Sequence, residues 1–88
     1  MSRQRSMEVI QQSEYVTIGE LVRLTDMRYS TLKFYTEEGM LLFKQEEEKL
    51  TRRYQRKESV ERIQMIRNFR EAGKTIPEIK KILRRVDG

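Results

Sequence analysis

The stretch TIGELVRLTDMRYSTLKFYTEEGM, residues 17–40, decides the fold because it encodes two short helices with only a brief turn between them. Thr17 and Glu20 form a capping-box pattern, in which the threonine hydroxyl accepts from the third helical amide and the glutamate reaches back to the threonine amide. Apolar residues follow at helical spacing until the pattern breaks at residues 24–27. The sequence therefore predicts a short first helix that starts after Thr17.

A second helix is predicted from about Arg28 to Glu38, and Gly39 supplies the left-handed residue that commonly ends helices. Each of the two helices is too short to be stable alone. Two such helices joined by a few residues are typical of a helix-turn-helix.

The rest of the chain predicts a wing and two further helices. Residues 42–45 and 50–54 can pair as two strands around a polar turn, although this turn has no glycine or asparagine. A third helix is predicted from about residue 57 to 71. A second capping box, Thr75 with Glu78, begins a fourth that runs to residue 86. The expected fold class is mainly α, a winged helix-turn-helix in the order helix, helix, β-hairpin wing, helix, helix.

Composition excludes several function classes. The 88 residues suit one domain, and they contain no cysteine and no histidine, which removes disulfides, thiolate or imidazole metal ligands and histidine general bases. The longest apolar run, residues 40–43, is far shorter than the roughly 20 residues of a membrane span, and the N-terminus lacks a signal-peptide pattern. We expect a cytoplasmic, nucleoid-associated protein that is not an enzyme, with no metal, cofactor, small-molecule ligand or membrane contact.

The net charge of +5 is unevenly distributed. Residues 1–50 hold seven Lys/Arg against nine Asp/Glu, a net −2, whereas residues 51–88 hold twelve against five, a net +7. A basic second half indicates an anionic partner, with nucleic acid ahead of a membrane surface.

The second predicted helix carries the main candidates for DNA contact. Because Leu32 must face the core, the outward side at the start of this helix carries Arg28, Tyr29, Ser30 and Lys33. In a helix-turn-helix, that position enters the major groove and reads base edges, while neighbouring polar groups hold phosphates. The alternative is that Arg28 and Lys33 are only solvated charges.

The basic run TRRYQRK, residues 51–57, is the second candidate. On a strand, Arg52 and Arg53 point to opposite faces, so one can straddle the DNA backbone while the other packs along the protein or pairs with an acid. Tyr54 is expected to fill the core under the hairpin. The alternative is a solvated stretch balanced by the acids at 46–48. The expected DNA contacts beyond the start of the helix are Thr17, Tyr35 (through its hydroxyl), Lys44, Arg52 and Arg53.

Several motifs in order resemble the MerR family of bacterial transcription regulators. They are YVTIGELVRLTDMRYSTLKFYTEEGML, RRY and VERIQMIRNFREAGKTIPEIKKIL, and they cover roughly residues 15–83. The resemblance implies a winged helix-turn-helix with the contacts named above: Lys33 at the phosphate-binding position, Tyr35 at the second aromatic, Arg28, Tyr29 and Ser30 at the base-reading start, and Arg52 and Arg53 as the wing pair. The chain departs from the family pattern at Asp26, where a turn glycine is usual, and at Ser30 and Gln45, where basic residues are common.

The expected function is a sequence-specific regulator that binds double-stranded DNA as a homodimer, because two half-sites multiply affinity. Family members normally continue into a long dimerisation helix and an effector domain, so a minimal form without its own sensor is expected. Residues 17–88 form the expected DNA-binding domain. Residues 1–16 form an arm or short helix, and the segment 6–14 with Met7 and Ile10, or else the last helix, is the expected pairing surface. The alternative for that segment is a frayed terminus.

Two rival functions remain open. The first is an architectural factor, such as an excisionase-like or segregation protein, that coats or bends DNA. The second is an adaptor that uses the helical faces of residues 57–86 and a basic surface to bind an acidic protein.

Overall fold

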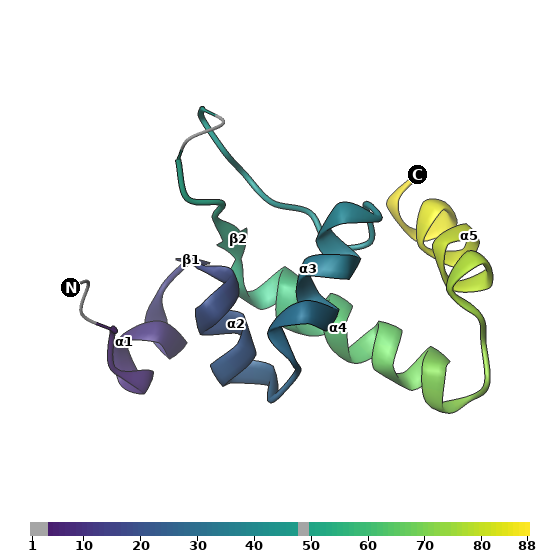
Figure 1. Cartoon of the computed structure of the whole chain (residues 1–88), viewed down its shortest axis with the longest axis horizontal. Helices are drawn as coiled ribbons and strands as arrows, with labels where there is room; N and C mark the ends of the chain where they lie inside the picture. The colour runs from purple at the N-terminus through teal and green to yellow at the C-terminus, as the bar shows by residue number, and fades with distance from the viewer. Residues whose placement is uncertain (1–3, 48–49) are drawn as a thin grey trace.

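The computed structural model describes residues 4–47 and 50–88, which form a small group of packed helices with a projecting wing (Figure 1). The helices are α1 (Met7–Gln12), α2 (Ile18–Thr25), α3 (Tyr29–Glu37), α4 (Arg56–Glu71) and α5 (Ile76–Asp87), and the strands are β1 (Tyr15–Val16) and β2 (Tyr54–Gln55). α1 and α5 lie at opposite ends of the molecule, and the wing, residues 42–47 and 50–53, extends away from the helices. The predicted fold class, a mainly helical winged helix-turn-helix, is confirmed.

The helix-turn-helix consists of α2 and α3. The predicted capping box is present: the Glu20 amide donates to the Thr17 hydroxyl over 3.2 Å, and the Thr17 amide donates to the Glu20 carboxylate over 2.9 Å. α2 ends at Asp26, whose φ of 57° is left-handed and fits glycine better than aspartate. The two helices pack against each other, and each buries a leucine completely, Leu21 in α2 and Leu32 in α3.

α4 and α5 form a second helical pair. The turn between them contains Gly73 with a φ of 88°, and the second predicted capping box, Thr75 with Glu78, then begins α5. The Lys80 ammonium donates to the Glu38 carboxylate over 3.0 Å. This ion pair links α5 to Glu38, the residue that caps the C-terminal end of α3.

The small sheet differs from the predicted hairpin. β1 pairs antiparallel with β2, in the register Tyr15–Gln55 and Val16–Tyr54. No strand is predicted at residues 15–16. Within the described residues, the wing keeps a single antiparallel bridge, where Lys44 and Arg53 exchange backbone hydrogen bonds of 2.7 and 2.8 Å. The predicted strands 42–45 and 50–54 are therefore mostly absent, because the turn lacks the residues of a tight hairpin and brings like charges together at 46 and 47. Residues 48 and 49 of that turn lie outside the described residues.

The core contains side chains from every helix and from Tyr54, which lies directly after the wing. Tyr54 is fully buried beneath the wing, as predicted, and its hydroxyl lies 3.0 Å from the hydroxyl of Thr36 in α3. Ile10 of α1 is also fully buried in this core. The expectation that Ile10 belongs to an exposed pairing surface is therefore wrong, because the chain's own core already covers this side chain.

Candidate nucleic-acid interface

The first turn of α3 is exposed and lacks a side-chain cap. Arg28 is the N-cap residue, with extended backbone angles (φ −70°, ψ 143°), and its side chain accepts no amide hydrogen bond. The Thr31 amide donates to the Arg28 carbonyl over 3.1 Å, so the Tyr29 and Ser30 amides are those of the first turn that remain available to an outside acceptor. The predicted outward set is exposed as a whole, namely Arg28, Tyr29, Ser30 and Lys33, whereas Leu32 between them is fully buried.

This face is electrostatically suited to an anion. The first turn of α3 contains no acidic residue. Among the described residues, the Arg28 and Lys33 side chains form no ion pair and no hydrogen bond. Two unpaired cations beside a helix N-terminus attract negative charge, since the helix dipole adds to their field.

Tyr35 differs from the other predicted contacts. Its side chain is 5% exposed and belongs to the core, with its ring centroid 6.2 Å from that of Phe34. Burial raises the pKa of the Tyr35 phenol, and the nearby Arg70 guanidinium partly opposes that rise. The ring thus supports α3 from inside, and only the hydroxyl end is a candidate for outside contact.

The two wing arginines have different surroundings. The Arg52 guanidinium lies over the Phe43 ring, 4.6 Å from its centroid, and that ring lies 6.0 Å from the ring of buried Tyr54. Arg53 lines a depression together with Tyr15 and Lys44, and its side chain forms no hydrogen bond or ion pair among the described residues. Among the described residues, the Arg53 side chain thus has no polar partner, whereas the Arg52 guanidinium covers the Phe43 ring.

Lys44 is held on the same face as Arg53. Its ammonium donates to the Tyr15 hydroxyl over 2.8 Å and lies 5.1 Å from the centroid of the Tyr15 ring. That hydrogen bond is the main cause of a raised pKa for Lys44. Tyr15, which comes from β1, therefore fixes the direction of the lysine at the base of the wing.

Thr17 occupies the N-cap of α2. Its hydroxyl oxygen accepts from the Glu20 amide, and the residue is partly exposed. Because a hydroxyl donates as well as accepts, its O–H remains available to a phosphate oxygen.

One cation beside α3 is missed by the sequence reasoning. Arg70, in the last turn of α4, lines a shallow depression together with Ser30 and Thr31 at the start of α3. The signal is present in the sequence, because Arg70 follows the buried Ile63 and Ile66 at helical spacing and so continues the stripe that faces the rest of the domain.

Other kinds of site find no support in the described part of the chain. Residues 4–47 and 50–88 hold no group of three or more Asp, Glu, His or Cys side chains placed to bind a metal ion. No described helix is long and apolar enough to span a membrane.

The comparisons with known proteins agree with this geometry. The family model described as MerR HTH family regulatory protein matches residues 16–86. Neither the curated proteins nor the solved structures contain a match to the chain.

Proposed function

This chain belongs to the MerR HTH family, and on that basis we propose that it regulates transcription by binding specific sites on double-stranded DNA. α3 lies in the major groove with its first turn against the bases. Arg28 and Ser30 read base edges, Tyr29 contacts a phosphate or a thymine methyl, and Lys33 holds a phosphate.

The observation that carries the proposal is the exposure of this first turn above a buried Leu32. Tyr29 is 55% exposed and Leu32 is 0% exposed, although they are only one turn apart on the same helix. A single exposed aromatic side chain is common on protein surfaces and carries little weight alone. Next to two unpaired cations, it fits a surface that receives a partner.

The wing supplies phosphate contacts beside the groove. Arg53 and Lys44 lie on one face of the wing, and Thr17 lies at the start of α2. Phosphate contacts of this kind fix the position and register of the helix on the duplex without reading its sequence. In this proposal α3 reads the bases, and the wing binds phosphates of the DNA backbone.

We further propose that the protein acts as a homodimer in the cytoplasm, with α5 as the pairing surface. α1 is less suited to be the pairing surface, because Ile10 is already buried in the core of its own chain. α5 offers Val86, which is 58% exposed at the end of its apolar stripe. Dimerisation would place two α3 helices on two half-sites about one helical turn apart.

The test is selection of bound duplexes from a random DNA pool, followed by footprinting on the selected sequence. We expect a consensus with two inverted half-sites and a footprint confined to it. A pool that returns no consensus would contradict sequence-specific regulation. An extended protected tract would favour an architectural coating protein instead.

A further inference from the structure

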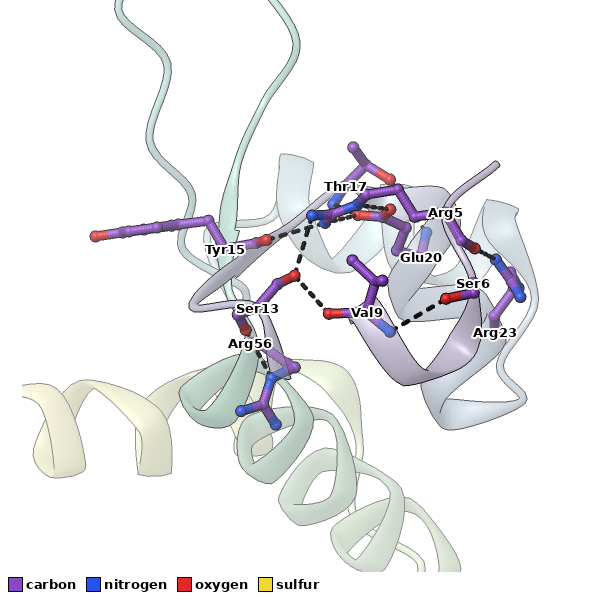
Figure 2. A network of polar contacts seen from close by, with 9 residues as sticks. All are labelled: Arg5, Ser6, Val9, Ser13, Tyr15, Thr17, Glu20, Arg23 and Arg56. Carbon is purple, nitrogen blue, oxygen red and sulfur yellow. Dashed lines mark hydrogen bonds and ion pairs between the residues drawn. The ribbon is translucent and has the colours of Figure 1, made fainter. Parts of the chain in front are cut away.

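The N-terminal arm is fixed to the helix-turn-helix by one arginine (Figure 2). The Arg5 guanidinium donates to both carboxylate oxygens of Glu20, over 2.6 and 2.7 Å, to the Ser13 hydroxyl over 3.0 Å and to the Tyr15 carbonyl over 3.2 Å. The Arg23 guanidinium in turn donates to the Arg5 carbonyl over 2.7 Å. Arg5 is thus held against the start of α2 by contacts with three segments of the chain.

The same guanidinium lines a shallow depression between the arm and the wing. Its rim is formed by two cations and two hydroxyls, Arg5, Arg53, Thr17 and Thr51. We call this feature the arm–wing depression. Glu20 also borders it, but both Glu20 oxygens are occupied, by Arg5 and by the Thr17 amide.

Both cations retain donors for an outside acceptor. Arg53 is exposed, and its side chain has no partner among the described residues. Arg5 has five N–H donors, and Glu20, Ser13 and Tyr15 take up four of them. Its side chain is 41% exposed, so the remaining donor can be reached from solvent.

The depression lies where a helix-turn-helix meets the DNA backbone. When the second helix occupies the major groove, the first helix crosses the sugar-phosphate backbone beside it. Thr17 is the N-cap of that first helix, α2, and it forms part of the rim. A phosphate near this helix start would face both arginines at once.

We propose that the arm–wing depression binds one DNA phosphodiester, with Arg5 and Arg53 as the cations and Thr17 and Thr51 as hydroxyl donors. This inference rests on the proposed DNA-binding function. It adds a contact from the N-terminal arm, which lies before residue 16, where the family match begins. α1 then has a second role besides filling the core, because it holds Arg5 in place.

The test compares the salt dependence of binding to a selected duplex for five proteins: wild type, Arg53→Gln, Arg5→Gln with Arg53→Gln, Ser6→Ala and Lys33→Ala. Neutralising one phosphate contributes about 0.9 to the slope of log K against log salt. Because the proposed homodimer has two such depressions, we expect the double variant to lose about 1.8 of that slope, about 0.9 for each subunit, and Arg53→Gln to lose part of it. Arg53→Gln removes no side-chain hydrogen bond or ion pair among the described residues, so little change in folding is expected from it.

Ser6→Ala is the matched control. It removes the cap bond from the Val9 amide to the Ser6 hydroxyl at the start of α1 and leaves every charge in place. We expect its slope to equal that of wild type, while circular dichroism verifies that each variant is folded under the binding conditions.

Two outcomes separate this inference from the proposed function. Wild-type slopes for both arginine variants, together with weakened binding by Lys33→Ala, would overturn the arm–wing contact and leave DNA binding intact. A wild-type protein that binds no duplex would overturn the proposed function and this inference with it.

Discussion

Replacing Arg5 by alanine should destabilise the whole domain, although Arg5 lies near the end of the chain. The variant leaves the Glu20 carboxylate without its cation, and that side chain is only 12% exposed. The capping box of α2 uses the same carboxylate, since the Thr17 amide donates to it. The first helix of the helix-turn-helix therefore depends on the arm.

The expected magnitude follows from the burial of the two partners. Exposed pairs contribute about 0–1 kcal/mol, whereas removing one partner of a fully buried pair costs about 3–5 kcal/mol. Arg5 is 41% exposed and Glu20 is 12% exposed, so this pair falls between the two limits after discounting for solvent screening. We expect Arg5→Ala to lower the free energy of unfolding by about 2 kcal/mol. For a domain of this size, that corresponds to a fall in Tm of about 8–16 °C.

The pH dependence carries a definite sign. The hydrogen bond from Arg5 is the main cause of a lowered pKa for Glu20 in the folded protein. A carboxyl group with a lowered folded pKa contributes stability above its unfolded pKa, about 4.3, and that stability is lost as the pH falls through the folded pKa. The difference between wild type and Arg5→Ala should therefore be full at pH 7 and shrink toward pH 3.

The assay is urea unfolding followed by circular dichroism at pH 7 and at pH 3, on wild type, Arg5→Ala, Glu20→Ala and the double variant. A double-mutant cycle should give a coupling free energy of about 1–2 kcal/mol at pH 7. Coupling near zero at pH 7, or an Arg5→Ala effect of equal size at both pH values, would refute this reasoning.

Three other substitutions test separate parts of the fold. Asp26→Gly should raise the free energy of unfolding by about 0.5 kcal/mol. The left-handed conformation of Asp26 costs about 1–2 kcal/mol, and removing this strain outweighs the backbone entropy that glycine loses on folding. The urea midpoint measures the change, and a lower midpoint for the variant would contradict strain at this turn. Tyr54→Phe should cost about 1–2 kcal/mol by removing the buried hydrogen bond to Thr36, and a thermal melt equal to wild type would show that this bond is not formed. Ile10→Ala should cost about 2–5 kcal/mol in urea unfolding, and a loss well below 1 kcal/mol would mean that α1 is not part of the core.

Local sequence signals predicted most of the helical framework. The capping boxes at Thr17 and Thr75 depend on residues three apart, and both are formed in the structure. The exposure of the first turn of α3 follows from helical spacing around Leu32 in the same way. Contacts within one or two helical turns leave a pattern in the sequence, and these patterns were sufficient to predict where α2 and α5 begin and which side of α3 is exposed.

Contacts between distant segments left no such pattern. β1 is only two residues long, and its partner β2 lies about forty residues further along the chain. A segment this short shows no alternation of apolar and polar residues from which a strand could be predicted. The burial of Ile10, the pairing of Arg5 with Glu20 and the bond from Lys44 to Tyr15 depend on the same packing. These contacts determine how the arm and wing present their cations.

The most direct test of the central claim is the affinity of wild type, Arg28→Ala, Lys33→Ala and Lys81→Ala for a selected duplex and for a scrambled one, across 50–200 mM salt. The exposed Lys81 lies on α5, on the side of the helix opposite the apolar stripe of Ile79, Leu83 and Val86. It is therefore outside both the α3–wing surface and the proposed pairing surface, and its substitution removes the same charge as Lys33→Ala. We expect wild-type affinity to fall roughly 10³–10⁵-fold over this range if a dimer neutralises about six to ten phosphates.

The variants should then divide by role. Arg28→Ala, which breaks no cap hydrogen bond, should reduce the preference for the selected duplex by about 1–3 kcal/mol. Lys33→Ala should weaken binding to both duplexes and lower the salt slope by about 2, one for each subunit of the dimer, and Lys81→Ala should match wild type. If Arg28→Ala kept the full sequence preference and Lys33→Ala bound as Lys81→Ala does, the start of α3 would not be the DNA-reading surface.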